Sequence, residues 1–207
     1  MVEAQVNVAY AVVGDIRRLS RAVTLRDQLS ARLALDMDED SNTNHDKAWQ
    51  MYNASDDWLV VVEDDVELVP NFQKHVQDAI ENMPDLGVLS LYAGYPRPER
   101  FRVASAVQKA KQYGASYLRY NRVLWGPAVA MRTDMIDDML NWVSGSDWPY
   151  DERFSQWMTA RRISAFYTMP SLVDHADIDS LLGRGGVPRK AYWFEEPTHW
   201  NSKAISI

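Results

Sequence analysis

The segment from Trp58 to Val66 constrains the fold most, because its five apolar residues, 58–62, run directly into the acids Glu63, Asp64 and Asp65. A short apolar run of this kind is typical of a strand buried on both faces of a parallel sheet. Side chains alternate along a strand, which predicts that Glu63 and Asp65 share one face while Asp64 lies on the other. Three adjacent carboxylates at the end of a buried strand repel one another unless positive charge lies beside them.

Segments with strand and helix patterns alternate along the rest of the chain. An apolar run over 6–13 ends at Gly14 and precedes an amphipathic stripe of leucines and alanine, which predicts a strand followed by a helix. The alternation favours an α/β fold: a Rossmann-like, mixed but mostly parallel sheet flanked by helices in one domain. Strands are expected over 6–13, 33–35, 58–62, 88–92, 116–120, 124–131 and 163–168, and helices over about 19–33, 44–54, 70–83, 103–113, 133–143 and 151–162.

The acidic strand end predicts a cation and nucleotide site. Ligands bind at the carboxyl ends of the strands in open α/β sheets, and oxygen ligands suit Mg²⁺ or Mn²⁺ bridged to phosphates. Val13 and Gly14, which end the first strand, and Asp36, in the loop after the second, are candidate nucleotide contacts. The alternatives are a solvated acidic turn before Pro70 for the triplet and an exposed acidic turn for Asp36.

Three further motifs follow the acidic run along the chain: Trp125–Arg132, Tyr150–Phe154 and Pro170–His175. In this order the four motifs resemble those of the GT-A glycosyltransferases, and the chain is similar to small enzymes of that group encoded by bacteriophages. The resemblance covers about residues 6–175. The acidic run is Glu-Asp-Asp where the pattern of the family is Asp-x-Asp.

The resemblance implies a GT-A domain over 1–176, with a nucleotide-sugar and metal half at 1–92, an acceptor half at 93–176, and a C-terminal tail or lid at 177–207. Asp65 is implied as a direct metal ligand, with Glu63 and Asp64 holding a metal-bound water or the ribose. His175 is implied as a nitrogen ligand, which favours Mn²⁺ over Mg²⁺; by itself it also suits a hydrogen-bonded loop histidine. The donor is expected to be a nucleotide diphosphate sugar, UDP-linked.

The same resemblance places the catalytic base at the start of a helix, as Asp151 or Glu152. An acceptor hydroxyl needs a base within hydrogen-bond reach, and a carboxylate there serves with inversion at the anomeric carbon. The alternative is purely electrostatic, since acids are common in the first turn of any helix.

Charge is distributed unevenly along the sequence. The chain carries 22 Lys and Arg against 29 Asp and Glu, a net charge of −7, but eleven of the acids lie between Asp36 and Glu67. The stretch 97–122 is instead basic and rich in aromatic residues, a combination that grips single-stranded or flipped-out nucleic acid. The alternative is a solvated helix beside core tyrosines. Candidate acceptor contacts are Arg97, Arg100, Arg102, Trp125 and Gly126.

By the phage resemblance, 5-hydroxymethylcytosine in DNA is the expected acceptor, ahead of a protein or a glycan. Arg184, in the glycine-rich run 183–186, is expected in a loop that closes over the diphosphate or the nucleic acid backbone. A metal-dependent nuclease or phosphotransferase would use the same acids, and a non-enzymatic sugar- or nucleic-acid-binding module is a third alternative.

Cysteine is absent, which excludes a disulfide scaffold, thiolate zinc ligands and a cysteine nucleophile. No apolar run approaches the ~20 residues that a membrane span needs, and no signal peptide precedes the first strand. The sequence therefore favours a cytoplasmic enzyme, in the host cytoplasm if phage-encoded, with no membrane partner.

Overall fold

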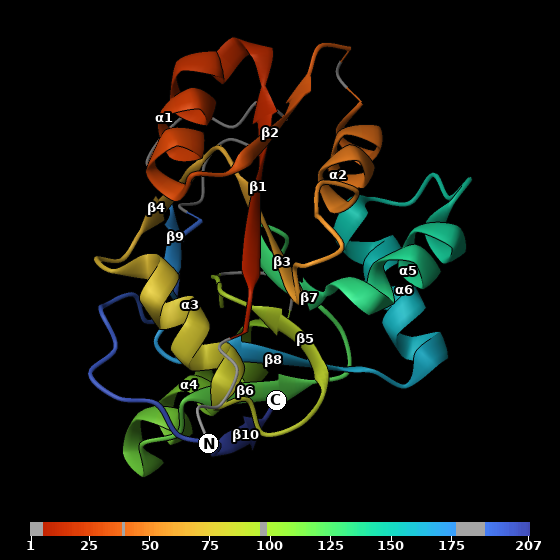
Figure 1. The fold of residues 1–207 in the computed structure, drawn as a ribbon. Coiled ribbons are helices and arrows are strands. Elements are labelled where there is room, and N and C mark those ends of the chain that lie inside the picture. Colours follow the sequence, from red (N-terminus) through yellow and green to blue (C-terminus); the bar gives the residue numbers. More distant parts are fainter. Residues whose placement is uncertain (1–5, 39, 96–98, 177–188) are drawn as a thin grey trace.

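An eight-stranded sheet runs through the computed structural model, which describes residues 6–38, 40–95, 99–176 and 189–207 (Figure 1). Its strand order is β10-β6-β8-β5-β7-β3-β1-β2, and β4 and β9 form a separate two-stranded ribbon. The strands are β1 Val8–Asp15, β2 Arg32–Asp36, β3 Trp58–Glu63, β4 Val66–Leu68, β5 Gly87–Ser90, β6 Tyr117–Tyr120, β7 Ala128–Arg132, β8 Ser164–Thr168, β9 Val173–His175 and β10 Ala204–Ser206.

The sheet is mixed, with more parallel than antiparallel pairs. Strand β1 pairs in parallel with β2 and β3, β5 with β8, and β6 with β10, whereas β7 runs antiparallel to both β3 and β5, and β6 to β8. The expected fold class, a mixed α/β domain with a mostly parallel sheet flanked by helices, is therefore confirmed.

Alternating side chains of the central strands build two cores, one on each face of the sheet. Tyr10 and Val12 of β1 join the core under α1 and α3, whereas Ala11 and Val13 join the core under α2, α4, α5 and α6. This is the period of two that a strand imposes. The helices are α1 Leu19–Leu29, α2 Ser41–Trp49, α3 Phe72–Glu81, α4 Arg100–Tyr113, α5 Ile136–Val143 and α6 Tyr150–Arg161, with short 3₁₀ turns at Ile16–Arg18 and Thr133–Met135.

Two expected boundaries are shifted for identifiable reasons. The strand expected from residue 124 begins at Ala128, because Gly126 and Pro127 precede it and proline cannot donate to the ladder. The first helix ends at Leu29 rather than at 33, because Ser30 takes the left-handed conformation (φ 51°) that closes a helix.

The described part of the expected C-terminal tail is packed on the domain. Ala191 forms a bridge with Gly94 and Phe194 with Ser171, and the chain then adds β10 to the edge of the sheet beside β6. The rest of that expected tail, 177–188, lies outside the described residues. Within the portion described, no helix is both long and apolar enough to span a bilayer.

Candidate active site

The carboxyl ends of β1, β2 and β3 meet at one edge of the sheet and bring acidic residues together. The register pairs Asp15 with Asp36 and Val13 with Glu63. Beyond β3, the backbone N–H of Asp64 donates to the carbonyl oxygen of Val13 (2.9 Å), and the N–H of Asp15 donates to Oδ2 of Asp64 (2.9 Å). The acids after β3 are thus held against the end of β1.

The expected alternation of the three acids is wrong beyond Glu63. Strand β3 ends at Glu63 and the next two residues form a turn, so the strand period no longer applies. Asp64 and Asp65 therefore share one cation: Nη1 of Arg18 lies 3.1 Å from Oδ1 of Asp64 and 3.2 Å from Oδ2 of Asp65. Glu63 instead approaches His45, with 3.5 Å between Oε1 and Nε2.

The β4–β9 ribbon places His175 beside Asp65. Val66 pairs with His175 across the ribbon, and the N–H of Ala176 donates to the carbonyl oxygen of Asp65 (2.7 Å). Nδ1 of His175 consequently lies 3.5 Å from Oδ1 of Asp65. Both residues are 5% exposed, and neither of these two atoms has a hydrogen-bond partner.

Burial and neighbouring charges set the ionisation of the two aspartates in opposite directions. Burial acts to raise the pKa of Asp65, but its interactions with His175, Arg189 and Arg18 outweigh burial and hold that pKa well below its usual range. Burial dominates at Asp64 and raises its pKa, although Asp15 and Arg18 oppose the shift. Asp65 is therefore a stable anion, flanked by Nη2 of Arg189 at 3.2 Å.

Asp65 and His175 are the two described side chains at the acidic turn that could supply ligands to a divalent cation. Among the described residues, no three His, Asp or Glu side chains converge to form a complete metal site. The pair nevertheless presents one carboxylate oxygen and one imidazole nitrogen, both buried, 3.5 Å apart and without a hydrogen-bond partner. Such a donor set suits Mn²⁺, whose remaining ligands can be waters and substrate phosphates.

Glu63 belongs to a second group of side chains, on the α2 side of the acids. Nδ1 of His45 lies 2.8 Å from the carbonyl oxygen of Ser41, and its ring stacks on Tyr150 with 3.9 Å between centroids. Gly126 lies against the same group, where a Cβ would come within 3.0 Å of the Tyr150 ring and 3.4 Å of Oε1 of Glu63. A larger residue at position 126 would crowd this corner.

The two candidate bases differ in their surroundings. Asp151 is half-buried, and burial, Glu152 and Glu63 together raise its pKa. Glu152 is exposed. The fold therefore brings Asp151, at the start of α6, into electrostatic contact with the acidic edge of the sheet.

The candidate nucleotide contacts lie along the ends of β1 and β2. A Cβ at Gly14 would lie 2.6 Å from Cβ of Ala22, so glycine is required there for α1 to pack. Val13 is buried in the core. Asp36 uses its Oδ1 to accept from the backbone N–H groups of residues 38 (3.0 Å) and 40 (3.2 Å), which orders its own loop.

The candidate acceptor residues fall into two places. Trp125 packs edge-on against Tyr92, with 5.9 Å between centroids, and Tyr92 packs edge-on against His175 at 5.2 Å. Trp125 and Gly126 are therefore brought to the acidic site. The described contacts of Arg102 are instead with Glu99, Tyr120 and the carbonyl oxygen of Ile207, at the β6 and β10 edge.

Arg100 lies at the start of α4, with its guanidinium over the rings of Tyr95 (5.0 Å) and Phe101 (5.4 Å). Among the described contacts of Arg100, none reaches the acids after β3. Arg97 and Arg184 lie outside the described residues.

Sequence reasoning missed Arg18 and His45. Arg18 is the last residue of the 3₁₀ turn that follows β1 and directly precedes α1. His45 is on α2, which crosses the same edge. Their contacts with Asp64, Asp65 and Glu63 are non-local, and the local pattern does not reveal them.

A cavity of about 310 Å³ lies beside Asp64, between α1 and β4. Polar residues of α1, including Arg21, form one wall, and Val66 and Asp64 form the other. Nε of Arg21 donates to the carbonyl oxygen of Asp64 (3.3 Å). The cavity therefore borders the acidic turn on its α1 side. The described residues that line this cavity are Ser20, Arg21, Thr24, Leu25, Gln28, Asp64 and Val66.

No protein-family profile matches the chain, and no curated protein does. Among solved structures, A197 from STIV is similar with a TM-score of 0.49 and 11% identity, over 93% of this chain and 98% of that one. The Drosophila β1,4-galactosyltransferase 7 complex with manganese, UDP-Gal and xylobiose has a TM-score of 0.47 and 10% identity, over 93% and 77%. A glycosyltransferase involved in glycosylation of the PBCV-1 major capsid has a TM-score of 0.47 and 9% identity, over 83% and 94%.

Proposed function

We propose that this protein is a metal-dependent glycosyltransferase that moves a sugar from a nucleotide diphosphate donor, UDP-linked, to a hydroxyl acceptor. The observation that carries the proposal is the buried pair Oδ1 of Asp65 and Nδ1 of His175, which lie 3.5 Å apart, have no hydrogen-bond partner and are set between Arg18 and Arg189. An anionic carboxylate beside an imidazole and two guanidiniums suits a cation and a diphosphate in the same place.

Asp65 and His175 would hold Mn²⁺ or Mg²⁺, and a bound ion of this kind acts as a Lewis acid that neutralises the charge of a leaving diphosphate. Arg18 and Arg189 contribute further positive charge at the same carboxylate. Asp64 fixes the end of β1 through the N–H of Asp15, and so keeps the turn in place. Glu63 and Asp36 are proposed to orient the ribose and a metal-bound water. Val13 and Gly14 are proposed to contact the nucleotide through their backbone.

Asp151 is proposed as the catalytic base. It accepts the proton of the acceptor hydroxyl while the hydroxyl oxygen forms its bond to the anomeric carbon. The bond from that carbon to the diphosphate oxygen breaks, and the diphosphate leaves with the electron pair. Attack from the face opposite the leaving group inverts the anomeric carbon. A raised pKa makes Asp151 a stronger base than an ordinary aspartate.

DNA carrying 5-hydroxymethylcytosine is proposed as the acceptor, on the strength of the phage resemblance and of the cluster at the start of α4. Phe101 is 81% exposed there, beside the Arg100 guanidinium. Cations beside exposed rings are what a stacked base and its phosphate require.

Transfer assays with Mn²⁺, a panel of nucleotide sugars and hydroxymethylated DNA test the proposal, read by nucleoside mass spectrometry. We expect a mass shift with the wild type and at least a hundredfold slower donor turnover with Asp65→Asn, while Asp27→Asn, on the exposed side of α1, keeps wild-type rates. Binding of Mn²⁺, followed by its electron paramagnetic resonance signal, should weaken in Asp65→Asn and in His175→Ala. Cleavage of the DNA strand without donor turnover would contradict the proposal and favour a nuclease.

A further inference from the structure

One flank of α4 and the chain that packs beside it form a surface of alternating rings and cations. The guanidinium of Arg100 lies over the rings of Tyr95, 5.0 Å from its centroid, and Phe101, at 5.4 Å. Nζ of Lys111 lies 4.7 Å from the centroid of the Trp193 ring. Arg100 and Lys111 are about three helical turns apart, so they project from the same flank of α4. We call this surface the ring–cation strip; its members are Tyr95, Arg100, Phe101, Lys111, Tyr192 and Trp193.

The ring–cation strip begins close to the acidic site. The segment that places Arg189 beside Asp65 reaches the strip three residues later, at Tyr192, and three residues of chain span at most about 11 Å. The ring of Tyr192 packs edge-on against that of Tyr95, with 5.6 Å between centroids, and its hydroxyl donates to the carbonyl oxygen of Arg100 (2.8 Å). A polymer that reaches the acidic site can therefore continue along the strip.

The two cations of the strip are exposed, and no acidic residue balances their charge. Helix α4 contains no Asp or Glu. Arg100 and Lys111 are both exposed, and neither is within ion-pairing distance of a carboxylate in the part of the chain that the structure describes. The acid next to the helix, Glu99, instead directs its carboxylate to Arg122 (3.3 Å). Positive charge and the 81% exposed ring of Phe101 are therefore available together to an anionic ligand.

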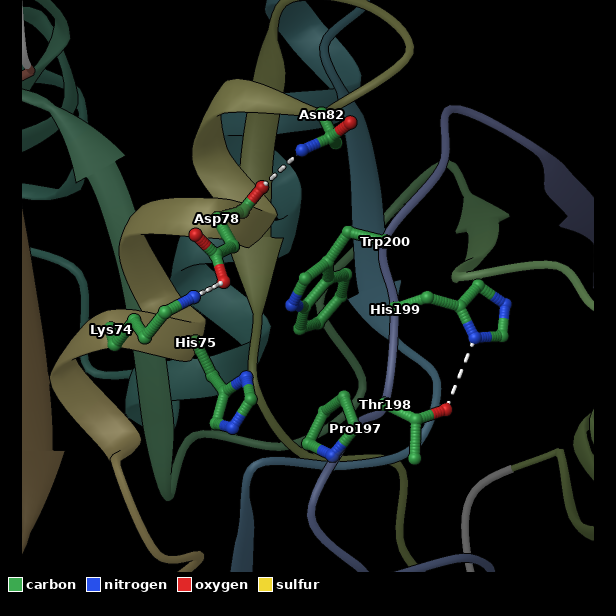
Figure 2. A pocket seen from close by; sticks show the side chains of 8 residues that line it. All are labelled: Lys74, His75, Asp78, Asn82, Pro197, Thr198, His199 and Trp200. Carbon is green, nitrogen blue, oxygen red and sulfur yellow. Dashed lines mark hydrogen bonds and ion pairs between the residues drawn. The ribbon is translucent and has the colours of Figure 1, made fainter.

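The basic residues of α3 differ in this respect (Figure 2). Nζ of Lys74 lies 2.5 Å from Oδ2 of Asp78, and Nε2 of His75 lies 3.3 Å from Oε1 of Glu196. Lys74, His75 and Asp78 line a cavity of about 270 Å³ between α3 and residues 197–200. Since each basic group there already has a carboxylate beside it, an anion gains less from this cavity than from the ring–cation strip. Lys74 is therefore a suitable control cation.

We infer that the ring–cation strip binds a single-stranded segment of nucleic acid next to the acceptor base, an inference that rests on the proposed function. Aromatic rings stack on bases of any sequence, and cations beside them neutralise the phosphates. From Arg100 to Lys111, α4 spans ~16 Å, enough for several nucleotides at ~3.4 Å each. The bases of a duplex are already paired and stacked, so their faces are not available to the rings. A neutral glycan would use the rings alone and leave both cations without a partner.

Fluorescence anisotropy of a labelled, unmodified oligothymidylate of about twelve nucleotides tests the inference, with the full chain and without donor or metal. We expect the single strand to bind about tenfold more tightly than its duplex with oligodeoxyadenylate, and log Kd to rise linearly with log salt from about 50 to about 300 mM NaCl. No binding at about 50 mM NaCl, or equal or tighter binding of the duplex, would overturn the inference. Displacement of the strand by a neutral chitin hexamer would overturn it as well.

Two variants separate stacking from charge. Phe101→Ala should weaken the single strand about tenfold with an unchanged salt dependence, because the lost stacking involves no counterion. Lys111→Gln should weaken binding and lower the slope of log Kd against log salt by about 0.7, the contribution of one phosphate contact on a single strand. Trp142→Ala is the matched control for the ring, since Trp142 is also exposed and lies under the Arg161 guanidinium, at 5.0 Å. Lys74→Gln is the control for the charge, and both controls should bind as the wild type does.

The same variants keep the failure of this inference apart from a failure of the proposed function. Binding of the single strand that weakens in Phe101→Ala and Lys111→Gln, without sugar transfer under any condition, would support the ring–cation strip and contradict the transferase. Transfer to hydroxymethylated DNA, with single-strand affinity unchanged in both variants, would support the transferase and overturn the strip.

Discussion

At the scale of single residues, Asp151 combines a cost to stability with a proposed role in catalysis. Its pKa is raised in the folded protein, so folding favours the protonated form and the charged form costs stability above the folded pKa. We expect Asp151→Asn to raise the melting temperature at pH 7, because it removes a carboxylate beside Glu63 and Glu152, and to abolish transfer.

The gain in stability from Asp151→Asn should vanish at acid pH. Below the unfolded pKa of about 3.9, aspartate is protonated in both states and the substitution removes no charge. Melting curves of the wild type and of Asp151→Asn between pH 3 and pH 8 check whether the difference in melting temperature grows with pH. An equal stabilisation at every pH would show that packing, and not charge, is responsible.

Arg153 forms a buried ion pair whose loss should destabilise the fold. Its buried guanidinium binds Asp46 at 2.6 and 3.1 Å and donates to the carbonyl oxygen of Asn42 (2.9 Å). Breaking a buried pair costs about 3–5 kcal/mol. We expect Asp46→Asn, which leaves the guanidinium buried without its carboxylate, to cost more than Arg153→Met, whose orphan Asp46 is partly exposed.

Urea denaturation of the two single variants and of the double variant measures this asymmetry. The double variant should lose less free energy of unfolding than the two single variants lose together, because the second substitution removes a group that the first has already left unpaired. Additive losses would contradict a coupled pair.

At the scale of elements, the β4–β9 ribbon is what joins the two proposed metal ligands. Val173 is fully buried in the ribbon and pairs with Leu68, two residues from the pairing of Val66 with His175. We expect Val173→Ala to cost about 2 kcal/mol of stability and also to weaken Mn²⁺ binding, because a loosened ribbon no longer holds His175 beside Asp65. Spin-resonance titration of Mn²⁺ measures the second effect.

Val143→Ala is the control for the ribbon. Val143 is equally buried, on α5, away from the ribbon, so it should lose similar stability with unchanged Mn²⁺ affinity. If both variants bind Mn²⁺ as the wild type does, the ribbon does not position the ligands.

The same elements show how far the sequence alone could lead. The strand and helix periods are local, and they predicted β1, β3 and the α/β alternation, while the acids after β3 and His175 were singled out by motif. Strands as short as β4, β9 and β10 have three residues each, too few for a period to be visible. The contacts of Arg18 and His45 join segments far apart in the chain, and only the folded structure reveals them.

At the scale of the whole molecule, the C-terminal segment connects distant parts of the domain. Arg189 reaches Asp65, and the adjoining residues pair with 94 and 95. Farther along, Trp200 lines the cavity beside α3, and β10 forms the edge of the sheet beside β6. A single stretch of chain thus contributes to the surroundings of Asp65 and to the sheet edge. Each of these contacts involves different residues, so one contact can be removed while the others are kept.

Deleting residues 204–207 tests that separation. The deletion removes β10 and the partly buried Ile205 and Ile207, so we expect a loss of about 2 kcal/mol and, because β6 becomes an exposed edge, self-association visible by sedimentation. Affinity for Mn²⁺ should not change, since Arg189 is held independently by the pairing of Lys190 with Tyr95 (2.8 Å). A loss of Mn²⁺ binding together with stability would instead show that the sheet edge and the acidic site unfold as one unit.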